Sequence, residues 1–300
     1  MNFFQAIILG LVQALTEYLP VSSSAHIRII GDLMIGSDPG AAFTAIIQIG
    51  TELAVLLYFR RDIVRILSHW FGCLFGRNGS DLRHRMGKGD KDALLGWYII
   101  IGTLPIVIAG LVFKHAIEST LRNLWITVAV LLIFGVLLWI VDDRSRQIKR
   151  IDDMNVKEAA IFGIGQMLAL IPGVSRSGGT ITFGRAMGYT REAAVRVAFL
   201  MAIPAVFGAG ILEAVSAIKD YAAGDLAGTP FPGWGPTIAA TIVSFLVGYI
   251  VIIGFLKFVS TFSYKAFAIY RIGLAVVVAI LLLTGALAPY EPASVAAALA

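Results

Sequence analysis

Six stretches of about 20 mostly apolar residues recur along this 300-residue chain and restrict the folds open to it. They lie at roughly 41–59, 93–113, 123–141, 192–213, 237–257 and 267–288. About 20 such residues let a helix cross a hydrocarbon core of about 30 Å. Charged residues make up only 14% of the chain, against about 25% in a typical soluble domain. We therefore expect residues 1–300 to form a single integral membrane domain, an all-α polytopic membrane protein, and we exclude a water-soluble globule.

Two shorter apolar segments, 3–19 and 157–171, run into breaks rich in Pro, Gly and Ser at 19–24 and 171–179. At membrane depth, irregular backbone is tolerated only where protein buries it or where it lines a wet cavity. The sequence therefore predicts two re-entrant helical hairpins whose polar tips lie inside the protein. We expect the first segment in the mature protein, because it has no basic flank and no small-residue cleavage pattern.

The two interrupted segments also resemble each other in sequence. The matching pairs are 10–15 with 163–168 and 21–24 with 174–177, both offset by 153 residues. Each half of the chain, about 1–141 and 157–288, then holds one hairpin and three spans. An odd number of spans inverts the second copy, so we expect an inverted-topology repeat with a site where the copies meet.

Basic residues gather in two segments, 60–92 and 142–157. Both are cytoplasmic loops by the positive-inside rule, which leaves 114–122, 214–236 and both termini on the outer side. Acidic residues interrupt both clusters and apolar spans flank them. We therefore expect no nucleic-acid partner.

Four ionisable residues inside the apolar or interrupted segments stand out: Glu17, His26, Glu52 and Arg176. A charge at a helix centre costs about 2.5–3.5 kcal/mol on insertion scales, so such residues are functional candidates. Arg176 lies between two serines in a Gly-rich turn, where N–H groups, hydroxyls and a guanidinium together suit a phosphate. Alternatively, a carboxylate such as Glu17 neutralises Arg176, which is compatible with phosphate binding.

The first hairpin carries a second group of polar residues. Gln13 and Glu17 are spaced i, i+4 and share a helix face, and their oxygens suit Mg²⁺ or Ca²⁺. A serine of 22–24 beside His26 fits an activated nucleophile, or the serines satisfy a helix end. Spacing leaves these roles open.

The span 41–59 adds a polar stripe at successive i+4 positions, made of Thr44, Gln48 and Glu52. We expect this stripe to face the hairpins and not lipid. Whether Glu52 is catalytic or pairs with a buried cation stays open.

The segments Glu17–His26 (EYLPVSSSAH) and Pro172–Thr180 (PGVSRSGGT) resemble the two signature motifs of the bacterial undecaprenyl-diphosphatase, or bacitracin-resistance protein, family. The resemblance covers essentially the whole chain. It implies hydrolysis of undecaprenyl diphosphate to undecaprenyl phosphate and inorganic phosphate, which recycles the lipid carrier for peptidoglycan and cell-envelope synthesis. It further implies a polyprenyl diphosphate lipid as the partner and the bacterial inner membrane as the location, with an active site that opens to the periplasm. A homodimer stays open.

The same resemblance implies roles for individual residues. The implied catalytic residues are Glu17, Ser23, His26 and Arg176, with Ser23 preferred over His26 as the nucleophile. The implied substrate-binding residues are Ser22, Ser175, Ser177 and Thr180. A divalent cation, Mg²⁺ or Ca²⁺, is implied on Gln13 and Glu17, although the neutral Gln13 weakens schemes that need two carboxylates. Glu52 matches no motif of the family.

Two other functions compete with this interpretation. A transporter or flippase of the polyprenyl phosphate carrier would share the inverted repeat and the broken helices. A phosphatase of the phosphatidic-acid type needs a histidine late in the chain, and none follows His115. The Glu, Ser, His and Arg side chains gathered on the two tips favour the diphosphatase.

Overall fold

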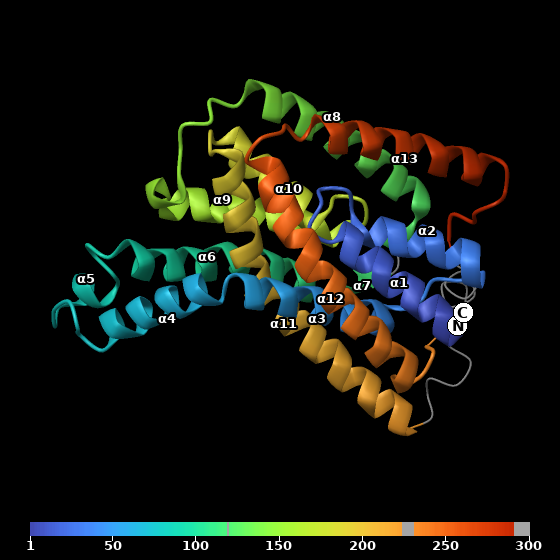
Figure 1. Ribbon diagram of the computed structural model, residues 1–300, viewed down its shortest axis with the longest axis horizontal. Helices are drawn as coiled ribbons and strands as arrows, with labels where there is room; N and C mark the ends of the chain where they lie inside the picture. The colour runs from blue at the N-terminus through green and yellow to red at the C-terminus, as the bar shows by residue number, and fades with distance from the viewer. Residues whose placement is uncertain (119, 224–230, 291–300) are drawn as a thin grey trace.

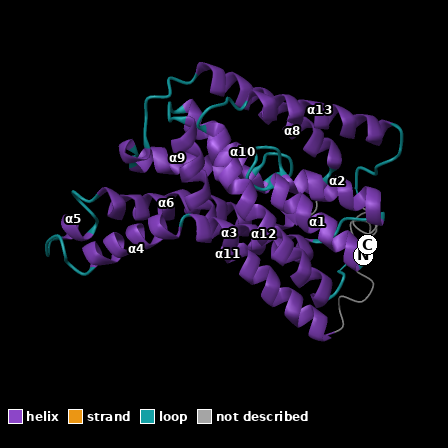
Figure 2. Ribbon diagram, in the orientation of Figure 1, coloured by secondary structure: helices purple, strands orange, loops and turns teal. Residues whose placement is uncertain are grey.

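The computed structural model describes residues 1–118, 120–223 and 231–290, and within them the chain forms helices and no β-strand (Figure 2). The first half contains α1 Phe3–Thr16, α2 Ser23–Ile35, α3 Ala41–Tyr58, α4 Arg60–Leu74, α5 Leu82–Arg85, α6 Lys91–Val112, α7 Lys114–Glu118, η1 Thr120–Arg122 and α8 Leu124–Arg144. The second half contains η2 Ile151–Asp153, α9 Val156–Met167, η3 Leu168–Leu170, α10 Arg176–Ala186, α11 Arg191–Ala223, α12 Trp234–Val259 and α13 Lys265–Leu283. The predicted all-α class is confirmed.

Five of the described helices, α6, α8, α11, α12 and α13, are long and apolar enough to cross a membrane. The pair α3 and α4 supplies a sixth candidate, which bends by 74° at its break. Large apolar side chains such as Ile133, Ile250 and Val277 lie exposed on the outward faces. Such a surface is stable against lipid and not against water, in agreement with a multi-pass membrane protein.

The two interrupted segments form the predicted helical hairpins, α1 with α2 and α9 with α10. We call residues 17–24 the first tip and residues 170–177 the second tip. Ser177 of the second tip donates a hydrogen bond to the Leu19 carbonyl of the first, with 3.1 Å between Oγ and O. The two turns meet near the middle of the molecule (Figure 1). The re-entrant placement of the hairpins in a membrane remains a prediction.

Around the hairpins, helices of the first half of the chain pack against helices of the second half. Helix α1 packs on α12, α9 packs on α6, and α8 lies along α13 (Figure 1). A Cβ on Gly10 would meet the backbone of Ala240, and a Cβ on Gly163 would meet that of Gly102. The glycines therefore permit close helix contact at matching positions. The inverted relation of the halves remains a prediction.

Two predicted loops contain more helix than expected. Segment 60–92 holds α4 and α5, because Ile66 and Cys73 bury one face of α4 while its arginines stay exposed. Helix α11 continues to Ala223, ten residues beyond the predicted span, since its last turns contain alanines and few helix breakers. Residues 224–230 of the predicted outer loop and 291–300 of the C-terminus lie outside the described residues.

A buried ion-pair network fixes the far end of α10. Asp142 of α8 accepts hydrogen bonds from Arg185 and Arg191, at 2.8 Å and 3.0 Å, and from the Tyr264 N–H at 3.0 Å. Arg185 is fully buried, and a buried charge is tolerated only when it is paired in this way. The network ties α8, α10, α11 and α13 together at the end of α10 that is farther from Ser175.

Candidate active site

The first tip brings the predicted carboxylate and serine together. Helix α1 ends at Thr16, next to Glu17. Pro20 lies in the non-helical segment that follows, and Ser22 caps the N-terminus of α2. The Gln13 amide donates to Glu17 Oε2 at 2.7 Å, which confirms the shared helix face. The Ser23 hydroxyl donates to the same oxygen at 2.6 Å. A hydroxyl bonded to a carboxylate is the arrangement of a nucleophile with its base.

The second tip repeats the backbone of the first. Ser22 and Ser175 have φ values of 73° and 69°, in the left-handed region that non-glycine residues avoid. Each caps the following helix, and each hydroxyl lies close to that of the serine two residues later, at 3.1 Å for Ser22 and Ser24 and 3.2 Å for Ser175 and Ser177. Such strain costs about 1–3 kcal/mol and persists where the surroundings enforce it, often at functional sites.

Arg176 joins the two tips and recruits a third element. Its guanidinium forms an ion pair with Glu17, and its Nη2 lies 3.0 Å from Oε1 of Glu52 on α3. The Glu52 side chain is 2% exposed and that of Arg176 is 17% exposed. The ion pair between Glu17 and Arg176, which the sequence offered as an alternative, is therefore present. The expected inward direction of the α3 stripe is confirmed at Glu52.

The remaining predicted cradle residues lie at the N-terminal end of α10. The Ser175 hydroxyl accepts from the Gly178 N–H at 3.1 Å, and Ser177 binds the first tip. The Thr180 hydroxyl donates to the Arg176 carbonyl within the same helix at 2.8 Å. Thr180 is thus close to the site, with its hydrogen directed to the backbone.

His26 lies beside this cluster and bonds elsewhere. Its Nδ1 is 2.7 Å from the Ser22 carbonyl, which only accepts, so Nδ1 carries the proton in the neutral ring. Nε2 then accepts from the Tyr270 hydroxyl at 2.7 Å, and the two rings stack with centroids 5.6 Å apart. The hydrogen-bond partner of Ser23 is Glu17 and not His26, so the geometry favours Glu17 as the base.

The cation expected on Gln13 and Glu17 can be tested against the donor atoms. Within the described ranges, no group of three His, Cys, Asp or Glu side chains is placed to hold a metal. However, Gln13 Oε1 and Glu52 Oε2 are buried there without hydrogen-bond partners. Together with Glu17, these oxygens suit a hard cation. The residues fit such an ion when substrate oxygens complete its shell.

The sequence patterns passed over two residues of the site, Tyr270 and Arg271, both on α13. Arg271 is fully buried and bonds to the backbone of both tips. Its charge inside the predicted span 267–288 is the same signal that points to Glu52. Tyr270 has no comparable signal, because a tyrosine in a span is ordinary.

Two cavities adjoin the tips. One, of about 10 Å³, lies between Glu17, Glu52, Arg176 and Phe199, and has room for about one water. The other, of about 260 Å³, reaches Ser24 and Pro172 and is lined by Thr44 and Gln48, the other members of the α3 stripe. The second is large enough to admit a headgroup to the tips.

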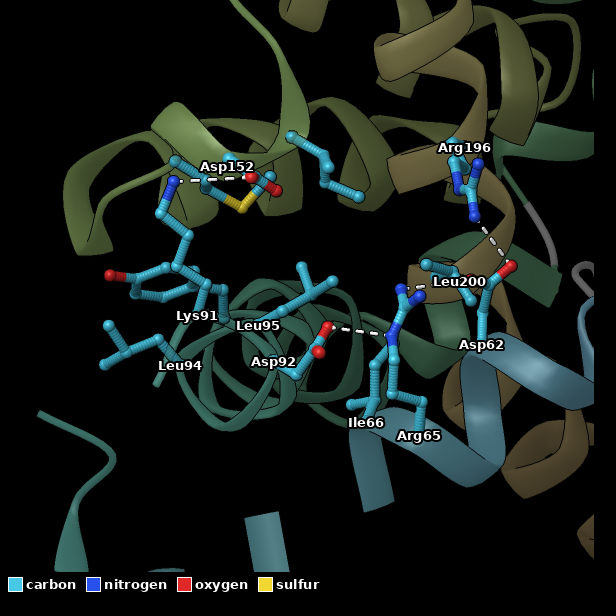
Figure 3. Close-up of a pocket in the computed structure, with 13 residues that line it drawn as sticks. Asp62, Arg65, Ile66, Lys91, Asp92, Leu94, Leu95, Asp152, Arg196 and Leu200 are labelled. Carbon is cyan, nitrogen blue, oxygen red and sulfur yellow. Dashed lines mark hydrogen bonds and ion pairs between the residues drawn. The ribbon is translucent and has the colours of Figure 1, made fainter. Parts of the chain in front are cut away.

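A further cavity, of about 230 Å³, lies away from the tips and joins segments 60–92 and 142–157 to α11 (Figure 3). Its charges pair across the walls: Arg196 with Asp62 at 2.7 Å, and Lys91 with Asp152 at 3.3 Å (Figure 3). It contains none of the predicted site residues. We interpret it as a structural ion-pair cluster that holds together the two segments predicted to be cytoplasmic.

Residues 6–277 match the model of the bacitracin resistance protein BacA family. The chain belongs to the BacA family. It is 80% identical over 291 residues to a protein of Bifidobacterium adolescentis named undecaprenyl-diphosphatase, covering 97% of this chain and 98% of that one. A protein of the same name from Renibacterium salmoninarum is 50% identical over 282 residues, covering 94% and 96%. Both tips of the BacA chain described here lie inside the matched region.

Proposed function

We propose that this chain hydrolyses undecaprenyl diphosphate to undecaprenyl phosphate and inorganic phosphate. The observation that carries the proposal is the meeting of the two tips, where a serine bonded to a carboxylate lies next to a paired arginine. This is the set that phosphoryl transfer needs: a nucleophile, a base and a positive group for the developing charge. Membership of the BacA family and the names of the relatives support it.

Substrate binding would use the second tip. The guanidinium of Arg176 and the hydroxyls of Ser175 and Ser177 suit the oxygens of the terminal phosphate. Arg176 is held by Glu17 and Glu52, so contacts within the protein fix its position. Such preorganised charge is the main source of transition-state stabilisation in this class of reaction.

The chemical step would start from the first tip. The Ser23 Oγ attacks the terminal phosphorus, its proton passes to Glu17, and the bond from that phosphorus to the bridging oxygen breaks. Undecaprenyl phosphate leaves with the bridging oxygen. A water then attacks the phosphorus of the phosphoserine. Glu17 returns the first proton to the Ser23 Oγ as the bond from that oxygen to phosphorus breaks. The freed Glu17 carboxylate takes a proton from the water and passes it to solvent as inorganic phosphate departs. His26 supports this tip through the Ser22 carbonyl.

A divalent cation is part of the proposal. Two carboxylates, Glu17 and Glu52, share the one guanidinium of Arg176, and an anionic diphosphate approaching them would be repelled. Gln13, Glu17 and Glu52 would hold Mg²⁺ or Ca²⁺ there, and the ion would supply charge neutralisation.

We further propose a bacterial inner-membrane location with the site open to the periplasm. Hydrolysis by this chain would recycle the lipid carrier for cell-envelope synthesis and confer bacitracin resistance. The charge pattern of the loops supports this orientation. The cavity at Ser24 also borders Arg28, Asp38 and Arg122, which lie at or near segments predicted to be outside. The ion pair of Lys91 with Asp152 (Figure 3) joins the two segments that are predicted to be cytoplasmic.

The test is release of inorganic phosphate from a long-chain polyprenyl diphosphate by the purified chain in detergent, with and without chelator. We expect turnover that chelator abolishes and added Mg²⁺ or Ca²⁺ restores. If chelator does not affect turnover, the proposed divalent cation is wrong and the proposed hydrolysis still stands. No release from folded protein under any metal condition would overturn the hydrolase and favour a transporter of the carrier lipid.

A further inference from the structure

Arg271 is a charged residue in the middle of an apolar helix, and its side chain is fully buried. No carboxylate pairs with it among the ion pairs of the described residues. A buried cation without a counter-ion is costly. Its retention in α13 must therefore be compensated by other polar contacts, and these contacts show what it does.

The two hydrogen bonds of Arg271 go to carbonyls of different tips. Nη1 donates to the Pro20 carbonyl at 3.2 Å, and Nη2 donates to the Gly173 carbonyl at 2.8 Å. These carbonyls lie in the broken, non-helical segments, where backbone acceptors lack helical partners. A guanidinium holds its donors in one rigid plane, so the two bonds together fix the distance between the tips.

The position of the two carbonyls links this contact to the chemistry. Pro20 lies between Glu17 and Ser23 along the first tip, and Gly173 precedes Arg176 by three residues along the second. Gly178 provides the room: a Cβ there would lie 2.7 Å from the Arg271 Nη1. A shift of one tip against the other would therefore move the nucleophile relative to the guanidinium that holds the phosphate.

We propose that Arg271 is a positioning residue that clamps the two tips in the register the phosphoryl transfer requires. This inference rests on the proposed function for its catalytic consequence, while the clamp itself is a property of the fold. Lysine cannot replace the guanidinium of Arg271, because its single ammonium group is a point charge and does not hold two donors at a fixed separation. Glutamine removes the buried charge and keeps one amide donor group.

The experiment compares R271K and R271Q with wild type and with R185K, a matched change at a fully buried arginine outside the tips. Phosphate release from a polyprenyl diphosphate gives kcat and KM. Hydrogen exchange followed by mass spectrometry reports on residues 17–24, 170–178 and 185–191 without reference to activity. Thermal unfolding in detergent shows whether each variant is folded.

We expect both Arg271 variants to lower kcat by about 100-fold with KM within about threefold, because misplacement by about 1 Å costs about that much. Exchange should rise in both tips together. R185K should raise exchange near 185–191 and keep kcat within about threefold. Because R271Q no longer buries a charge, its stability should exceed that of R271K while its kcat is equally low.

Three results would overturn the clamp: kcat within threefold of wild type in either folded Arg271 variant, a change confined to KM, or exchange that rises in one tip only. An inactive wild type would overturn the proposed function instead. The exchange comparison would then still decide the clamp, since it needs no turnover.

Discussion

The two tips share a backbone and differ in chemistry. At an offset of 153 residues, Ser22 matches Ser175, and both have the same strained φ, the same cap and the same serine pair. At the same offset, however, Ser23 matches Arg176 and Glu17 matches Leu170. One tip carries the proposed nucleophile and its carboxylate, and the other carries the arginine. A single type of turn, used twice, thus supplies the two opposite halves of the proposed phosphoryl-transfer site.

The difference also explains why the tips must meet. Neither contains a complete set of groups, and the arginine of one forms its ion pair with the glutamate of the other. Glu52 of α3 and Arg271 of α13 are not on either tip, yet each contacts the joined pair. The site is therefore a property of the junction.

The largest expected effect comes from making the tips alike. R176S gives the second tip the Ser-Ser-Ser sequence of the first and removes the guanidinium. We expect phosphate release to fall by about 10⁴-fold, since an arginine at a transferred phosphoryl group contributes about 10³–10⁵. R185S, at the other end of α10, is the control for a lost arginine. A residual rate above one tenth of wild type would show that the second tip does not hold the phosphate.

The carboxylate of the first tip should rank next. E17Q keeps the shape of the side chain but removes the base for Ser23, and we expect a loss of about 10³-fold in kcat. E158Q is the matched control, because Glu158 is also buried and paired, with Tyr189 at 2.8 Å, but lies away from the tips. Equal losses in the two variants would assign Glu17 a purely structural role.

A smaller effect is expected at His26, which follows the first tip and is matched by Gly179 after the second. Y270F removes the hydroxyl that bonds His26 Nε2 and leaves the ring stack. If His26 supports the turn and Glu17 is the base, kcat should fall by less than about fivefold, as one hydrogen bond contributes about 1 kcal/mol. A loss above 100-fold in steady-state assays would instead make His26 a participant in the chemistry.

The smallest effects test the shared backbone. S22G and S175G relieve the positive φ but remove a cap and a serine pair, and these contributions largely cancel. We expect each change to alter the free energy of unfolding by less than about 1 kcal/mol and with the same sign at both tips. Thermal unfolding in detergent measures this. Opposite signs would mean that the tips are alike in sequence only.

Much of the fold could be read from the sequence because hydrophobic length and chain breaks are local signals. The spans at α6, α8, α12 and α13, the two hairpins and the matching serines all follow from residues near one another in the chain. The helix α4 was missed because its exposed arginines resemble a loop, although Ile66 and Cys73 bury one face. Charge counts do not distinguish a loop from an amphipathic helix.

The sequence points to the residues that meet at the tips and to one of their pairings, Glu17 with Arg176, but not to the other pairings. Spacing points to Glu17, to His26 and to a serine of 22–24, and the family resemblance selects Ser23. Neither decides which side chain accepts the serine proton, because the Pro20 break removes helical register. The partner of His26 is 244 residues away, and the carbonyls that bind Arg271 are on both tips. Such contacts depend on tertiary packing, which no local pattern contains.

The most direct test of the junction is phosphate release by S23A, R176A and the double variant, each confirmed as folded. If Ser23 and Arg176 act as one site across the two tips, each single change lowers kcat by at least about 10³-fold. The double variant should then be no more than about threefold slower than the slower single variant. A wild-type rate in S23A, or losses that multiply in the double variant, would contradict the account.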